Sequence, residues 1–278
     1  MFGFAKTSWV VSLIPILSLQ ALGVSESTPV TPATASAPAI VVGFVGGFVG
    51  RNDLRHGPVQ LAQRLQREVP QSAAYVRVFE NRHRKRAYKT ILHLLDCNHD
   101  GVLSQTEKEH ARIVLYGHSW GAAAAVLLAR DLRRRGIPVL LTVQVDSVAK
   151  LWQNDSVIPD NVAEAVNYYQ PHGIVHGSAR IVAADPLKTR ILGNYMMDYR
   201  KHPVGCAENS WYDRFFTPGH AQSECDPHVW SQIEKMVVEL VMPQPSAVAA
   251  NPSPLPDAAL QENIVDKASV ADKGSDRH

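Results

Sequence analysis

The chain alternates short apolar runs with polar or helix-forming stretches. Five runs rich in Val, Ile and Leu predict β-strands, and turn residues or segments with helical periodicity separate them. Because these runs are apolar on both faces, they favour a parallel sheet that helices cover on both sides. The runs are AIVVGFVGG from Ala39, AAYVRVF from Ala73, RIVLYG from Arg112, VLLTVQVD from Val139 and ARIVAAD from Ala179.

A closing helix is predicted after the last strand. Between Ile233 and Val241, apolar residues recur with helical spacing and would place one face against the sheet. The pattern therefore predicts one α/β domain over residues 39–242, in which a mostly parallel sheet is flanked by helices.

Both ends of the chain differ in composition from this core. Residues 1–23 combine one lysine, a short apolar stretch and small residues, which is typical of a secretory signal peptide. An uncleaved anchor is the alternative, although Pro15 interrupts a run that is short for a spanning helix. Residues 24–38 and 243–278 are predicted to be a flexible linker and a disordered tail, because few of their side chains suit burial. We therefore expect a secreted or periplasmic protein without stable membrane insertion after cleavage.

The charge of the chain limits the classes of binding partner, and its cysteines raise the question of a disulfide. The formal net charge of +2 creates no strong field, so we expect no nucleic-acid partner. The basic run from Arg82 to Arg86 is interpreted as the solvated start of a helix rather than as an anion site. Cys206 and Cys225 flank a loop and could pair in an oxidising compartment, leaving Cys97 free, but their spacing does not decide this.

A Gly-x-Ser-x-Gly sequence follows the third apolar run directly. Residues 117–121 read GHSWG, and the strong helix former AAAAVLLARDLRRRG comes next. A strand, a sharp turn and a helix form the context in which such a serine becomes a nucleophile elbow. Ser119 is therefore the candidate nucleophile, and His118 before it is interpreted as structural. Gly117 and Gly121 are expected because the turn brings strand and helix too close for a β-carbon.

With this turn, the whole core resembles the α/β-hydrolase family. The resemblance implies that an acid and then a histidine follow Ser119 along the chain. A serine hydroxyl is a weak nucleophile, so it needs a base to take its proton and a carboxylate to orient that base. The resemblance also implies a lipase- or esterase-type hydrolase that acts on a small-molecule or lipid ester through an acyl-enzyme.

Two aspartates at predicted strand ends are candidates for the acid. Asp146 ends the strand after Ser119, and Asp185 ends the next predicted strand; the family uses both positions. Asp146 is favoured because it is one strand from the serine and has small or polar neighbours, and Asp185 stays the alternative. For the base, the resemblance favours His220, in a predicted loop before the closing helix, over His228, expected at the surface. No partner can be named from spacing for His56, His172, His176 and His202.

The oxyanion formed on attack needs backbone N–H donors, and one such donor contributes about 2.7 to 4 kcal/mol. Trp120, which follows the serine, is expected to supply one. The turn VVGFVGG resembles the His-Gly-Phe turn of lipases, with Val42 in place of the histidine. Carried over by position, the second donor is Phe44, with Val45 close behind.

The segment DCNHDGVLSQTE, from Asp96 to Glu107, resembles an EF-hand loop at every ligand position. Cys97 and His99 fall between those positions, so a zinc site is not indicated. No second loop is present to pair with it, which excludes an opening sensor pair. The resemblance implies a structural Ca²⁺ that joins a helix end to the strand of Ser119. Its expected ligands are Asp96, Asn98, Asp100, Val102, Ser104 and Glu107.

Two classes of function remain open on this basis. The first is a secreted serine hydrolase, of which an amidase or peptidase would be a variant. The second is a catalytically silent hydrolase fold that serves as a calcium-stabilised interaction module. The intact Gly-x-Ser-x-Gly sequence favours the first. Acyl-chain length and oligomeric state do not follow from the sequence.

Overall fold

The computed structural model describes residues 37–206 and 218–242. All of them belong to one folded unit. The predicted signal peptide and disordered tail, and nearly all of the predicted linker, lie outside the described residues. Within the described ranges, no helix is both long enough and apolar enough to span a membrane.

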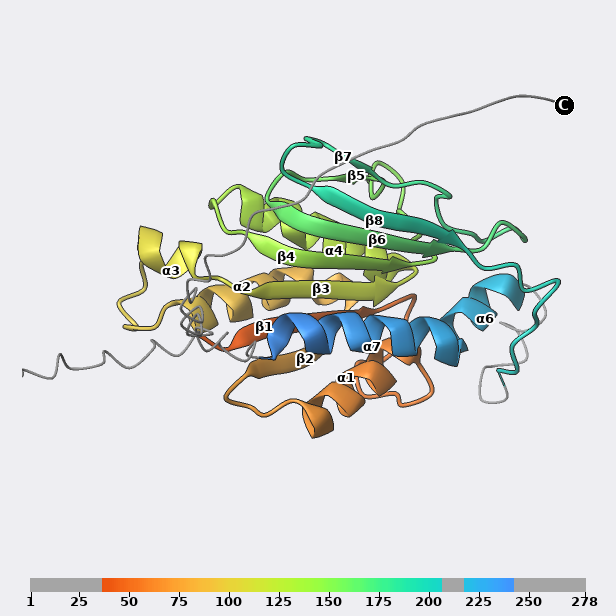
Figure 1. Cartoon of the computed structure of the whole chain (residues 1–278), viewed down its shortest axis with the longest axis horizontal. Coiled ribbons are helices and arrows are strands. Elements are labelled where there is room, and N and C mark those ends of the chain that lie inside the picture. The colour runs from red at the N-terminus through yellow and green to blue at the C-terminus, as the bar shows by residue number, and fades with distance from the viewer. Residues whose placement is uncertain (1–36, 207–217, 243–278) are drawn as a thin grey trace, which may run out of the picture. The chain divides into compact units, whose positions relative to one another are not determined.

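Six parallel strands form the central sheet, in the order β2-β1-β3-β4-β6-β8 (Figure 1). The predicted fold class, an α/β fold with a parallel sheet flanked by helices, is confirmed. The strands are β1 (Ala39–Val45), β2 (Ala74–Glu80), β3 (Ile113–His118), β4 (Val139–Val145), β6 (Val162–Tyr169) and β8 (Arg190–Met196).

The fifth predicted strand is wrong as a member of this sheet. Of ARIVAAD, only β7 (Val182–Ala183) is extended, and it pairs with β5 (Val157–Ile158) in a separate two-stranded sheet. β6 and β8 take its place in the central sheet, and neither was predicted from the sequence. β6 carries the polar Glu164 and Asn167 within its apolar pattern, and β8 is an edge strand with partly exposed side chains, so neither is a continuous apolar run.

Four longer helices cover the two faces of the sheet. The helices α1 (Gly57–Glu68) and α7 (Pro227–Val241) pack on one face, while α2 (Arg84–Leu95) and α4 (Trp120–Arg133) pack on the other (Figure 1). Successive residues of a strand point to opposite faces, so Val41 lies in the first core and Val42 in the second. The shorter helices are η1 (Asn81–His83), α3 (Gln105–Glu109) and α6 (Pro218–Cys225).

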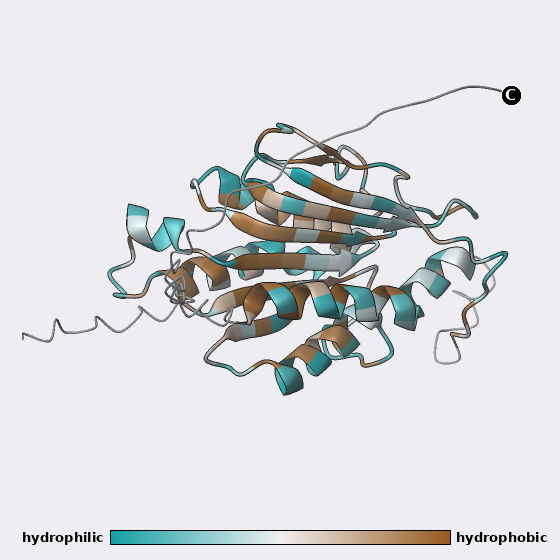
Figure 2. Ribbon diagram, viewed as in Figure 1, coloured by the Kyte–Doolittle hydropathy of each residue, from teal (hydrophilic) through white to brown (hydrophobic). Residues whose placement is uncertain are grey.

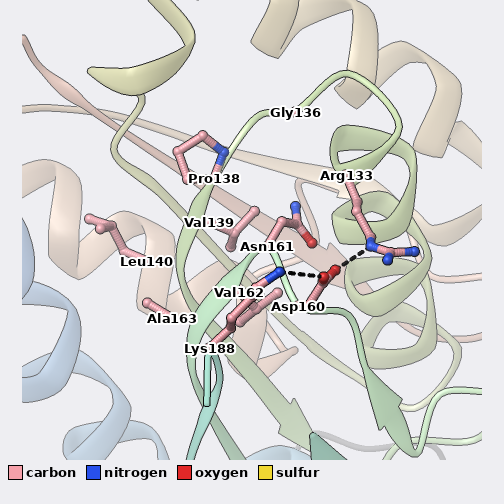
Figure 3. Close-up of a pocket in the computed structure, with 10 residues that line it drawn as sticks. All are labelled: Arg133, Gly136, Pro138, Val139, Leu140, Asp160, Asn161, Val162, Ala163 and Lys188. Carbon is pink, nitrogen blue, oxygen red and sulfur yellow. Dashed lines mark hydrogen bonds and ion pairs between the residues drawn. The ribbon is translucent and has the colours of Figure 1, made fainter. Parts of the chain in front are cut away.

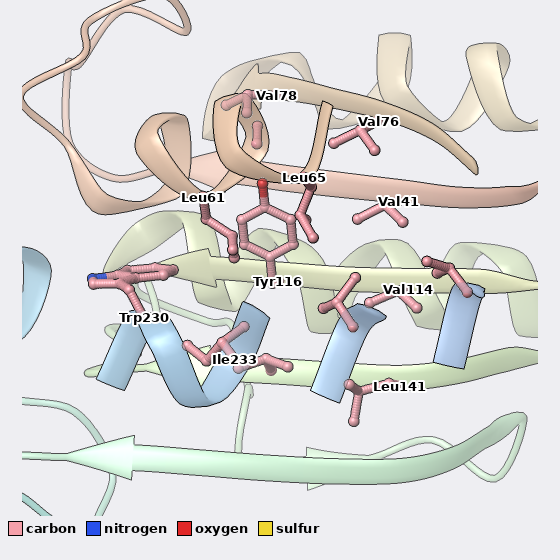
Figure 4. Packing of buried hydrophobic residues seen from close by; sticks show 14 of the residues in the cluster. Val41, Leu61, Leu65, Val76, Val78, Val114, Tyr116, Leu141, Trp230 and Ile233 are labelled. Atoms are coloured by element: carbon pink, nitrogen blue, oxygen red, sulfur yellow. The ribbon is translucent and has the colours of Figure 1, made fainter. Parts of the chain in front are cut away.

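The central strands are apolar along most of their length, and the helices turn apolar stripes toward them (Figure 2). On the α1 and α7 face, Tyr116 of β3 lies among Leu61, Leu65 and Trp230 (Figure 4). Its hydroxyl donates to the carbonyl of Pro58 at 3.0 Å, so this buried polar group is satisfied. Tyr116 thereby joins β3, the strand that leads to Ser119, to α1 through this hydrogen bond and to α7 through the edge contact with the Trp230 ring.

The start of α7 is anchored by a cap and a disulfide. The carboxylate of Asp226 accepts the N–H of His228 at 2.9 Å, and Pro227 occupies the first helical turn. Cys206 and Cys225 form the disulfide that the sequence left undecided, with Cα atoms 5.9 Å apart. Cys97 is free and exposed.

Candidate active site

Ser119 occupies a strained turn between β3 and α4. Its φ of 57° and ψ of −129° are rare for a residue with a β-carbon, and such strain costs about 1 to 3 kcal/mol. A β-carbon at Gly117 would lie 2.5 Å from the carbonyl carbon of Gly121, and one at Gly121 would lie 2.3 Å from the carbonyl oxygen of Phe44. Both glycines are therefore required by close backbone packing around the serine.

Asp146 and His220 meet at the carboxyl end of β4. His220 Nδ1 lies 2.7 Å from Asp146 Oδ2, and the aspartate is fully buried. The other oxygen of Asp146 accepts the N–H of Gly177 at 2.6 Å, and Gln170 Nε2 donates to Oδ2 at 3.0 Å. Burial alone would raise the pKa of Asp146, but the hydrogen bonds from His220, Gln170 and Gly177 outweigh it and lower the pKa.

The environment of His220 suits a neutral imidazole. Burial lowers its pKa, and the nearby His118 lowers it further, while Asp146 acts in the opposite direction. Since a carboxylate only accepts, Nδ1 of His220 donates to Asp146, and Nε2 is left to accept a proton. Within the described residues, Ser119 Oγ makes no hydrogen bond, which is common before substrate is bound. His220 lies in α6 rather than in the predicted loop.

The two alternative site residues lie elsewhere. Asp185 follows β7, where its carboxylate accepts the N–H of Leu187 at 3.0 Å in a turn. This is a local backbone contact, and the aspartate is not at a strand end of the central sheet. His228 lies on α7, where its Nε2 is 2.8 Å from the side-chain nitrogen of the exposed Gln232. Neither residue contacts Asp146 or His220 in the described part of the chain.

The backbone beside Ser119 differs from the predicted oxyanion pair. Phe44 lies inside β1, in register with Phe79 on one side and Gly117 on the other. Gly46 lies next to the serine instead, because a β-carbon there would be 2.8 Å from Ser119 Cβ and 3.5 Å from its Oγ. Trp120 is the first residue of α4, where backbone N–H groups have no partner within the helix. The geometry therefore favours Gly46 and Trp120 as the backbone groups that face an oxyanion.

A buried polar network contacts His220, and no spacing in the sequence indicates it. The ring of His118 contacts that of His220 in a tilted arrangement with centroids 4.5 Å apart, and its Nε2 is 3.2 Å from the carbonyl oxygen of His220. Ser223 Oγ donates to the same carbonyl at 2.8 Å. Glu224 Oε1 lies 3.4 Å from His118 Nδ1 and 2.8 Å from His56 Nδ1. The backbone of the candidate base is thus held from two sides.

The charges in this network are mutually stabilised. Burial would raise the pKa of Glu224, but the charges and hydrogen bonds of His118 and His56 lower it far below its usual range. Burial would lower the pKa of His56, yet the hydrogen bond and charge of Glu224 outweigh burial and raise it. Glu224 is therefore an ionised carboxylate inside the protein, as its placement between two imidazoles requires.

The loop of residues 96–107 joins α2 to α3 and folds on its own polar groups. Asp96 Oδ2 accepts the N–H of Gly101 at 2.9 Å, and Asn98 Oδ1 accepts the N–H of Asp100 at 3.1 Å. Gly101 has a φ of 81°, which favours glycine. These side chains turn into the loop, and their oxygens are the donor type that Ca²⁺ prefers.

The closing glutamate of this loop is engaged by the start of α3. Glu107 accepts the N–H and the hydroxyl of Ser104, each at 2.8 Å, and also the N–H of Cys97 at 2.8 Å. These hydrogen bonds lower the pKa of Glu107. Across the described ranges, no group of three or more His, Cys, Asp or Glu side chains is arranged to hold a metal ion. The oxygen donors fit calcium chemically, but Glu107 would have to exchange these bonds for the ion, so calcium stays a prediction.

A cavity of about 490 Å³ lies at the opposite edge of the sheet (Figure 3). Its lining includes Val139 and Val162, the first residues of β4 and β6, and Asp160, which pairs with Arg133 and Lys188. Ligands of open parallel sheets bind at the carboxyl ends of the strands. Since Ser119 and Asp146 lie at those ends, we assign the candidate active site to that edge of the sheet and not to this cavity.

No protein-family model matches the sequence, and no curated protein matches it. Among solved structures, it is similar to a cutinase-like protein from Cryptococcus sp. (12% identity, 75% of this chain, 97% of that chain, TM-score 0.38). A thermostable esterase from Pseudomonas putida matches at 10% identity, 75% of this chain, 76% of that chain and a TM-score of 0.38. The RedJ thioesterase from Streptomyces coelicolor matches at 13% identity, 72% of this chain, 91% of that chain and a TM-score of 0.33. These are distant similarities to hydrolases, so the functional argument rests on the geometry of the site.

Proposed function

We propose that this protein is a serine hydrolase that cleaves carboxylic esters through an acyl-enzyme on Ser119. The observation that carries the proposal is the strained Ser119 turn at the same sheet edge as the buried Asp146–His220 pair. A nucleophile at such a turn and a base oriented by a carboxylate are the parts that acyl transfer requires.

The reaction follows from these roles. Ser119 Oγ attacks the ester carbonyl while His220 Nε2 takes the hydroxyl proton, and backbone N–H groups of Gly46 and Trp120 bind the oxyanion. Collapse of this intermediate breaks the ester bond, and His220 returns the proton to the leaving alcohol. Water then attacks the acyl-enzyme with His220 again as base, which releases the acid and restores the serine. Asp146 holds the Nδ1–H tautomer throughout.

Paired substitutions test this assignment. We expect Ser119→Ala and His220→Ala to abolish turnover of 4-nitrophenyl hexanoate, and Asp146→Asn to reduce it by about 10⁴-fold. The matched changes His228→Ala and Asp185→Asn should leave turnover within about twofold, because neither residue contacts the pair. Unchanged turnover in folded Ser119→Ala would refute the proposal.

The alternative is a catalytically silent interaction module on the same fold. Reaction of the wild-type protein with an organophosphonate, followed by recovery of the label on Ser119, would exclude it. An unlabelled Ser119 in folded protein would favour it, since only an activated serine reacts readily. Hydrolysis of an amide rather than an ester would keep the mechanism and change only the substrate class.

Two further proposals accompany the hydrolase. The composition of residues 1–23 supports export, so the protein found outside the cytoplasm should begin near Val24. The oxygen donors of the 96–107 loop support a structural Ca²⁺, which would be held by Asp96, Asn98, Asp100 and Glu107 with the carbonyl of Val102 and the ninth-position Ser104. The ion would tie the end of α2 to the start of α3. A chelator that lowers the Tm of the wild type but not that of Asp96→Ala would support this site. An unchanged Tm of the wild type would refute it.

A further inference from the structure

A second, smaller cavity lies along α4, the helix that begins directly after Ser119. It has a volume of about 220 Å³, and its lining includes Trp120, the residue after Ser119. The rest of the lining comes from η1, from the first turn of α2, from α4 and from the loop after β4. The lining residues are Asn81, Arg82, Arg84, Lys85, Trp120, Ala124, Leu127, Lys150 and Gln153.

One wall of this recess is apolar. Trp120, Ala124 and Leu127 recur at helical spacing on α4 and so form one stripe of that helix. At 1.5 Å per residue the stripe runs about 10 Å away from Ser119. A short hydrocarbon chain attached to the reacting carbonyl could lie along it.

Most of the other lining side chains are cationic. Arg82, Arg84, Lys85 and Lys150 line the recess, and no acidic side chain does. Arg84 Nε lies 3.3 Å from Asp131, which also pairs with Arg134, so that single carboxylate is shared by two guanidinium groups. Within the described residues, Arg82, Lys85 and Lys150 make no ion pair. The recess therefore carries an excess of positive charge beside an apolar stripe.

The recess is also joined to the backbone around Ser119. Lys150 Nζ lies 4.6 Å from the ring centre of Trp120 and donates to Asn81 Oδ1 at 2.9 Å. Asn81 Nδ2 in turn donates to the carbonyl of Gly47 at 2.6 Å, next to Gly46 at the candidate oxyanion position. One cation of the recess is therefore linked by hydrogen bonds to the backbone next to Gly46.

We propose that this recess binds the anionic end of the substrate, so that the preferred substrate is an ester whose acyl chain is short, apolar and ends in an oxyanion, a carboxylate or a phosphate. The inference rests on the proposed hydrolase and names its substrate class. From its sequence, the run from Arg82 to Arg86 was interpreted as a solvated helix start. In the structure, Arg82, Arg84 and Lys85 of that run line one recess with Lys150.

A matched pair of esters tests the proposal. Mono-4-nitrophenyl adipate and 4-nitrophenyl hexanoate have the same chain length and leaving group, and only the first ends in a carboxylate. An exposed cation about 6 Å from that carboxylate increases affinity about threefold in water. Because at least two such cations line the recess, we expect kcat/KM for the adipate ester to exceed that for the hexanoate ester about tenfold or more at low salt. The excess should shrink as the Debye length falls from about 30 Å at 0.01 M to about 8 Å at 0.15 M salt.

Substitutions in the recess test whether its cations cause the preference for the adipate ester. The double change Arg82→Gln and Lys85→Gln should reduce kcat/KM for the adipate ester about tenfold and leave the hexanoate ester unchanged. Arg86→Gln is the matched control, because it removes a charge from the same basic run but lies outside the recess. Equal kcat/KM values for the two esters in the wild type, or an equal loss in Arg86→Gln, would overturn the proposal.

A binding experiment tests the anion site independently of the proposed hydrolase activity. If neither ester is turned over, the hydrolase assignment fails, and calorimetry with hexyl phosphate and with adipate still tests the recess. Tighter binding of either anion to the wild type than to the double variant supports the anion site, and the stronger of the two identifies phosphate or carboxylate as the group. Equal binding to both proteins overturns it.

Discussion

Replacing Glu224 by Gln removes a buried charge and keeps the side-chain shape. In the wild type, this carboxylate lies 2.8 Å from His56 Nδ1 and 3.4 Å from His118 Nδ1. The folded pKa of His56 is raised, so its stabilisation is complete below the unfolded value of about 6.5 and is lost as pH rises through the folded value. The folded pKa of Glu224 is lowered, so its stabilisation is present above about 4.3 and is lost as pH falls through the folded value. The pair therefore stabilises the fold most between about pH 4.3 and 6.5.

The expected loss of unfolding free energy in Glu224→Gln follows from this pH range. At about pH 5.5 the variant leaves a protonated His56 with only Asp53, 3.6 Å from its Nε2, as a carboxylate partner. Removal of one partner of a buried pair costs about 3 to 5 kcal/mol. Because the His56 side chain is 14% exposed, we take the lower end, about 3 kcal/mol. Above the folded pKa of His56 the imidazole is neutral, and the cost should fall to about 1 kcal/mol, the value of a neutral hydrogen bond.

Urea unfolding followed by tryptophan fluorescence measures both costs. Wild type and Glu224→Gln are compared at about pH 5.5 and at a pH about two units above 6.5, with m-values checked for equality. Glu239→Gln is the control, since this glutamate lies on α7 with 63% of its side chain exposed and should change stability by less than about 0.5 kcal/mol. The same loss of stability at both pH values would refute the buried charge pair and leave only packing around Glu224.

Three other outcomes are expected. The lowered pKa of His220 predicts that kcat/KM rises with pH through an apparent pKa below 6.5 and then stays level, and a rising limb centred above 6.5 would contradict it. Gly46→Ala would place a methyl group 2.8 Å from Ser119 Cβ, so kcat should fall about 10²-fold or more in protein whose circular dichroism is unchanged, whereas Gly50→Ala, with open space around it, should not affect kcat. Removal of the Cys206–Cys225 bridge by Cys206→Ser with Cys225→Ser, two positions 19 residues apart, should reduce the free energy of unfolding by about 3 kcal/mol in urea titrations. Reductant should not lower it further in that variant, and a further loss would show that another thiol is responsible.

The strands that carry the chemistry were predictable because their pattern is simple. β1, β3 and β4 are buried on both faces, so their sequences are continuous apolar runs, and Ser119 and Asp146 follow two of them directly. β6 and β8 lie toward the edge of the sheet, where polar side chains interrupt the pattern. The strand expected at residues 179–185 was wrong for the same reason, since a short apolar run does not reveal which sheet it joins.

The contacts around His220 could not be predicted from spacing. Glu224 and His56 are 168 residues apart in the sequence, and His118 and Ser223 are 105 apart, so only the tertiary fold brings them together. A glutamate near the end of a short helix ordinarily indicates a solvated position, and only the burial of both partners identifies a charge network. Gly46 replaces Phe44 in the proposed oxyanion pair because its backbone lies beside Ser119, and sequence position alone does not reveal that approach.

His220 is held by two carboxylates that act on different atoms. Asp146 contacts the ring at Nδ1 and so determines which nitrogen is free to accept the serine proton. Glu224 acts through His118, which contacts the carbonyl oxygen of His220 and its ring face, and so determines where that ring lies. Under the proposed mechanism, loss of the first should change the tautomer and therefore kcat at every pH, whereas loss of the second should displace the base and leave its tautomer unchanged. The two carboxylates are thus separable by experiment, although both lie within one buried cluster.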